Sequence, residues 1–81
     1  MEIVKLAPGA QPPETADYVA IVEEDGQFGF SGQIEKIHGP MKASVYLIGP
    51  EWYPSFDEAL TAGLVWADSH GAGRIYVEVA A

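Results

Sequence analysis

The residue types of a hydrolytic triad occur together once in the chain, as Asp68-Ser69-His70. Their adjacency argues against a triad, because neighbouring residues on a helix point in different directions and cannot form a proton relay. We therefore interpret them as the end of a helix, with the histidine beside the negative pole of the helix dipole. The other histidine, His38, lies far from it in a His-Gly-Pro turn, where we expect it at the surface, so the sequence predicts no metal site.

Two groups of acidic residues resemble sites that use carboxylates for catalysis or for calcium binding. Asp57 and Glu58 could serve as an acid–base pair for glycoside cleavage, but a place in the first turn of a predicted helix already explains them. Glu23, Glu24 and Asp25 form the one dense acidic cluster. This acidic cluster lacks the alternating oxygen ligands of a calcium loop, so we interpret it as the solvated tip of a hairpin.

The sequence contains no motif that is typical of a catalytic nucleophile or of a cofactor site. Gly29-Phe30-Ser31-Gly32 has the form of a GxxG nucleic-acid loop, but it lies inside a predicted strand between apolar residues. The chain has no cysteine, no phosphate-binding loop and no dinucleotide fingerprint. We predict no catalytic residues and no cofactor, and we expect that the protein is not an enzyme.

The length and the net charge of the chain argue against further classes of protein. The chain has 81 residues, of which 48% are hydrophobic, so it is the size of one small domain and too apolar for a disordered acidic tail. Its net charge of −8 disfavours direct contact with nucleic acid or with an anionic membrane surface. The first residues carry an early acid and no long apolar run, which is untypical of a signal peptide, so we expect a cytoplasmic protein.

Alternating apolar side chains indicate the elements of the fold. A β-prone run at residues 18–22 is followed by Asp25-Gly26, the dipeptide favoured in a two-residue type I′ turn, and by an alternating strand at residues 28–35. Such a hairpin pairs residue 23 with 28, 21 with 30 and 19 with 32. One buried face then collects the apolar side chains of Val19, Ile21, Phe28, Phe30 and Ile34.

The second half of the chain contains a strand at residues 44–48, a helix from 56 to about 69 and a strand at residues 74–79. Ser55 is the expected N-cap of the helix, with Glu58 completing a capping box. Gly63 lies in the apolar stripe of the helix, where a close approach to the sheet would justify a glycine.

These elements predict an α+β fold: an antiparallel β-meander with one helix packed on one face, in the order β-β-β-α-β. Residues 3–6 could add an N-terminal edge strand. We divide the chain into an extended proline-rich N-terminal segment (residues 1–16) and a single small α+β domain (residues 17–81). The place of the last strand stays open, because the helix could return it beside either outer strand.

One helix covers one face of such a sheet, so aromatic side chains on the other face are candidates for protein contact. The candidate interaction residues are Tyr18, Tyr46, Tyr76, Trp52 and Tyr53. Two alternatives remain open for them. The N-terminal segment could fold back over the tyrosines, and Trp52-Tyr53 could pack against the start of the helix.

The leading hypothesis is a small, acidic, non-catalytic protein-binding module, with a protein partner of unknown identity and homodimerisation left open. The alternative is an acidic inhibitor of the immunity or anti-defence type, which would occupy the basic site of a nuclease or another nucleic-acid-binding protein through Glu23, Glu24 and Asp25. A third hypothesis is a small-ligand pocket between the helix and the sheet.

Overall fold

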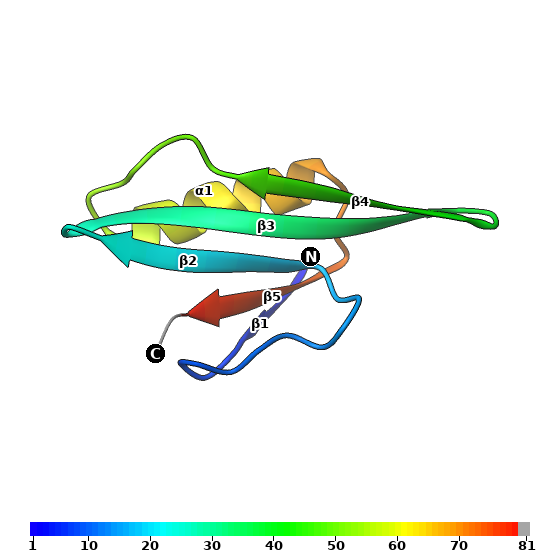
Figure 1. The fold of residues 1–81 in the computed structure, drawn as a ribbon, viewed down its shortest axis with the longest axis horizontal. Helices are drawn as coiled ribbons and strands as arrows, with labels where there is room; N and C mark the ends of the chain where they lie inside the picture. The colour runs from blue at the N-terminus through cyan, green and yellow to red at the C-terminus, as the bar shows by residue number, and fades with distance from the viewer. Residues whose placement is uncertain (80–81) are drawn as a thin grey trace.

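A computed structural model describes residues 1–79, apart from the side chains of Ile37 and His38. Over these residues the chain forms a five-stranded sheet and one helix. Figure 1 shows their arrangement. In chain order the elements are β1 (Glu2–Lys5), β2 (Tyr18–Glu24), β3 (Gln27–His38), β4 (Met41–Ile48), α1 (Phe56–Ser69) and β5 (Arg74–Val79). The α+β class and the N-terminal edge strand are confirmed. The side chain of His38, which we expect at the surface, lies outside the part of the chain that the structure describes.

The β2–β3 hairpin forms with the predicted register, in which Glu23 pairs with Phe28, Ile21 with Phe30 and Val19 with Gly32. Its turn residues Asp25 and Gly26 have φ angles of 52° and 77°. Two consecutive positive φ angles are the signature of the type I′ turn, whose twist matches that of the flanking strands. The local sequence is therefore sufficient to set this register.

The sheet is mixed, which corrects the expectation of a plain antiparallel meander. Its strand order is β1-β5-β2-β3-β4. The strands β2, β3 and β4 form the expected antiparallel meander, but β5 lies parallel to β2 and β1 lies parallel to β5. The helix returns the chain to the far side of β2, so the last strand runs in the same direction as β4 and β2.

The β3–β4 hairpin is longer than the sequence indicated. It closes at Gly39, whose φ is +60°, so His38 pairs directly with Met41. As Figure 1 shows, the two strands run together past the start of β2 to a distant tip. Just before β2 begins, the side chain of Asp17 continues the contact with β3: its Oδ1 accepts a hydrogen bond from the Glu35 N–H at 2.8 Å.

The helix packs on one face of the sheet through its apolar stripe. Ser55 caps it as predicted, since the Ser55 Oγ accepts from the Glu58 N–H at 3.2 Å. Gly63 is buried, and a Cβ there would lie 2.6 Å from a Val19 methyl carbon, which confirms the predicted close approach. The core lies between helix and sheet, and its fully buried large side chains are Val19, Ile34, Ile75 and Val77.

Candidate interaction surface

The register places three of the candidate tyrosines in one row across the sheet. Tyr18 lies opposite Tyr76 on β5 and opposite Gln33 on β3, and Gln33 in turn lies opposite Tyr46 on β4. Their neighbours in each strand, such as Val19 and Val77, are buried under the helix. Because side chains alternate along a strand, the row lies on the face opposite α1, which we call the open face.

Trp52 and Tyr53 separate onto the two faces of the sheet. Tyr53 forms an isolated antiparallel bridge with Phe28, with N···O distances of 2.8 and 2.7 Å, and packs against the core. Trp52 lies over Gly29, where a Cβ would be 3.2 Å from the indole ring. Gly29 alternates with the core residues Phe28 and Phe30, so Trp52 belongs to the open face.

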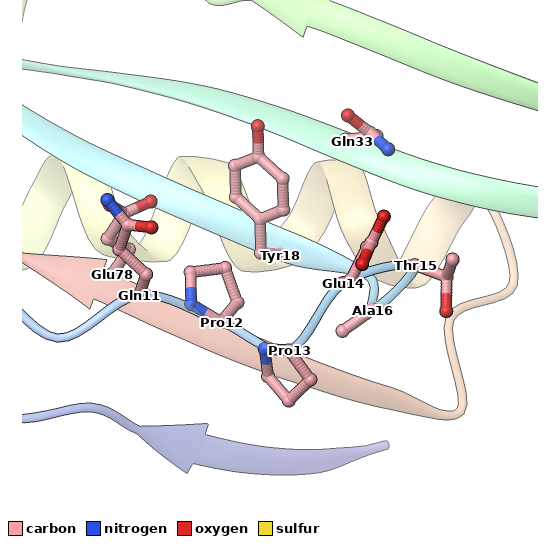
Figure 2. Close-up of a pocket in the computed structure, with 9 residues that line it drawn as sticks. All are labelled: Gln11, Pro12, Pro13, Glu14, Thr15, Ala16, Tyr18, Gln33 and Glu78. Atoms are coloured by element: carbon pink, nitrogen blue, oxygen red, sulfur yellow. The ribbon is translucent and has the colours of Figure 1, made fainter.

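The N-terminal segment covers one part of the open face. Two backbone hydrogen bonds hold it alongside β5. The Leu6 N–H donates to Val77 O at 3.0 Å, and the Gly9 N–H donates to Val79 O at 2.9 Å. It then turns back, leaving a cleft of about 340 Å³ against the sheet (Figure 2). The cleft is lined by Gln11, Pro12, Pro13, Glu14, Thr15, Ala16, Tyr18, Gln33 and Glu78.

Tyr18 lines this cleft and is half-buried. Tyr76 is also half-buried, so both tyrosines differ from Tyr46, which is 57% exposed. The remaining uncovered apolar side chains lie over the β2, β3 and β4 part of the face. We call this set the open-face patch. It consists of Val22, Tyr46, Ile48 and Trp52, with exposures of 42%, 57%, 70% and 47%.

Ile48 was absent from the sequence-based candidates. The signal for it was the alternation that begins at Tyr46, since a strand residue two positions further on shares the same face. Between the side chains of the patch lie two small, half-buried residues, Ala20 and Ser31, while Gly29 is covered by Trp52. The patch therefore combines large, exposed side chains with small side chains between them.

The acidic cluster does not present a single negative surface. Glu23, Glu24 and Asp25 are all exposed at the end of the β2–β3 hairpin. Glu23 pairs with Phe28 on the helix side, and the alternation therefore directs Glu24 to the open face. A phosphate mimic needs its carboxylates aligned, and these three are divided between the two faces and the turn.

The residues considered for catalysis have structural roles in the helix. Asp57 and Glu58 are exposed in its first turn. At the other end, the Ser69 Oγ donates to Trp66 O at 2.7 Å, and the His70 Nδ1 lies 2.9 Å from the same carbonyl. Within the described residues, no group of three His, Cys, Asp or Glu side chains could hold a metal ion.

The Tyr18 phenol offers a spectroscopic test of this geometry. Burial raises its pKa, and the nearby Tyr46 and Glu78 raise it further. Because the folded pKa exceeds the unfolded value of about 10, the stability from this group is complete below that pH and is lost as the pH rises through the folded pKa. We expect Tyr18→Phe to remove a late phenolate step in a near-ultraviolet titration and to reduce alkaline destabilisation. Loss of an early phenolate step instead of a late one would contradict the partial burial of Tyr18 beside Tyr46 and Glu78.

Comparison with known proteins gave no assignment: no family model, curated protein or solved structure matches the chain. The described part of the chain contains no helix with the length and apolar character needed to span a bilayer.

Proposed function

We propose that this chain is a small cytoplasmic, non-catalytic module that binds a protein partner through the open-face patch. The observation that carries the proposal is the gathering of Val22, Tyr46, Ile48 and Trp52, all substantially exposed, on the part of the sheet that neither α1 nor the N-terminal segment covers. Contiguous exposed apolar side chains of this kind mark interaction sites on soluble proteins.

The composition of the patch suits protein recognition. Tyrosine and tryptophan are the side chains that most often dominate the binding energy of protein interfaces. Trp52 is already held against Gly29, so binding would restrict its motion little further. The small residues beside it leave room for side chains of a partner. The proposal therefore predicts a salt-tolerant contact with an apolar centre.

The first test is affinity capture from a lysate with wild-type protein, Trp52→Ser and Val65→Ser as baits. Val65 is 64% exposed on α1, away from the patch, so its substitution is the matched control. We expect one or more proteins to bind wild-type and Val65→Ser baits and to be lost from Trp52→Ser. Capture of no protein, or equal capture by Trp52→Ser, would contradict the proposal. The fold of each bait is checked by circular dichroism.

The acidic inhibitor is the second candidate, and the exposure of all three acids at one hairpin end favours it. The basic side chains offset little of the charge there, because Arg74 pairs with Glu2 and the Lys36 ammonium donates to the His70 carbonyl at the helix end. Such an inhibitor would associate fast and lose affinity steeply with salt. A partner that is basic and released at moderate salt would support this candidate over the apolar contact.

A further inference from the structure

We propose that β4 is the docking site for a second copy of this chain, which adds its own β4 in antiparallel fashion to give a two-fold symmetric dimer. The strand lies at one edge of the sheet, beside β3 alone. Joining two copies there would unite the two sheets into one continuous sheet. This inference does not rest on partner binding by the open-face patch, although Tyr46 and Ile48 belong to both sites, with their side chains in the patch and their backbone groups at the edge.

The hydrogen-bonding direction of each β4 residue follows from one bond. The Gly49 N–H donates to Phe30 O at 2.8 Å, which directs position 49 toward β3. In an antiparallel ladder this direction alternates along the strand, so positions 47, 45 and 43 also bond β3. The backbone N–H and C=O groups of the intervening residues therefore point away from β3, toward the free edge of the sheet. These residues are Lys42, Ser44, Tyr46 and Ile48, and all four are exposed.

A single register satisfies all of these outward groups. When two β4 strands pair with Val45 on the two-fold axis, Lys42 faces Ile48 of the partner and Ser44 faces the partner's Tyr46. Every outward N–H and C=O of the four residues then has a partner, because hydrogen-bonded pairs in antiparallel strands exchange two bonds. A two-fold contact of this kind is self-complementary and closes after two copies.

Charge and edge protection both favour this strand over β1. Edges are normally blunted by short length, charge or proline. The β1 strand has these devices: it has four residues, carries Glu2 and Lys5, and is followed by Pro8. The β4 strand has eight residues, no proline and a single charge, Lys42. In the proposed register Lys42 lies near the partner's strand end, which continues into Glu51, so like charges do not face each other.

The first experiment measures the dimer constant by analytical ultracentrifugation for wild-type, Ser44→Pro and Ser44→Ala proteins. The N–H of Ser44 points outward, so proline removes a bond to the partner while keeping the β3 ladder. The Ser44→Ala control removes only the side-chain bond to Glu35. We expect Ser44→Pro to weaken dimerisation about 30-fold or more and Ser44→Ala to change it little. Since each copy carries −8, added salt should strengthen the dimer.

A second experiment tests the proposed dimer even if the Ser44→Pro variant fails to fold. The chain has no cysteine, so a single one can be placed at will. In the proposed register the two Val45 residues form a non-hydrogen-bonded pair, whose Cα separation of about 4.5 Å suits a disulfide. We expect Val45→Cys to form a covalent dimer under mild oxidation much faster than Ala43→Cys, although Ala43 is the more exposed. Equal rates, or a monomer at concentrations up to about 1 mM, would overturn the proposal.

Discussion

Replacing Gly32 by valine is expected to lower the free energy of unfolding by about 3 kcal/mol or more. Gly32 is buried on β3 beneath the indole of Trp66, and a Cβ built on it would lie 2.3 Å from the Trp66 Cζ3. The ring also packs against Phe30 and His70, with centroid separations of 6.3 and 5.0 Å. The larger residue must therefore displace a rigid side chain that has neighbours of its own.

Urea unfolding of Gly32→Val and of Gly73→Ala measures this effect. A Cβ at Gly73 meets no atom within 4 Å, so that control should change stability little. The cause is isolated by repeating Gly32→Val in a Trp66→Ala background, where the penalty should fall by at least about 1 kcal/mol. An equal penalty in both backgrounds would show that the indole is not what requires a glycine at this position.

The second large effect is expected for Ile75→Ala, which should destabilise the fold by about 2–5 kcal/mol. Ile75 has no exposed surface and lies in the core between the sheet and α1. A domain of this size has a total stability of only about 4–12 kcal/mol, so the cavity left by the substitution would remove a large fraction of it.

Ile3→Ala is the matched control, because Ile3 pairs directly with Ile75 on the neighbouring strand but is 44% exposed. The same atoms are removed, and the smaller burial predicts a change below about 1 kcal/mol. Both variants should unfold with the wild-type denaturant slope. Comparable losses for the two isoleucines would contradict the burial of Ile75 in the core and the exposure of Ile3 at the edge of the sheet.

Local signals allowed much of this fold to be predicted. The dipeptide Asp25-Gly26 determined the turn type, and the alternation on either side of it determined which residues pair. The helix was predicted from Phe56 to about Ser69 because a cap, acids in the first turn and an apolar stripe agree. These signals act between residues close in sequence, and their physics depends little on the rest of the chain.

Features that depend on distant segments could not be predicted in this way. The place of β5 between β1 and β2 depends on how the helix crosses the sheet. Trp52 lies on the open face and Tyr53 on the helix side because residue 53, rather than 52, pairs with Phe28. The need for glycine at Gly32 arises from Trp66, a residue on another element. The covering of Tyr18 likewise requires the return of the N-terminal segment.

The central claim is that the open-face patch binds a protein, and its most direct test is the dissociation constant of the captured partner across a salt series. Wild-type protein is compared with the Val22→Ser/Trp52→Ser variant, which leaves β4 and the acidic cluster intact. We expect the double substitution to weaken binding about 100-fold, with a wild-type affinity that depends little on salt. An unchanged affinity in the variant, or a loss that instead follows salt and neutralisation of Glu23, Glu24 and Asp25, would contradict the claim.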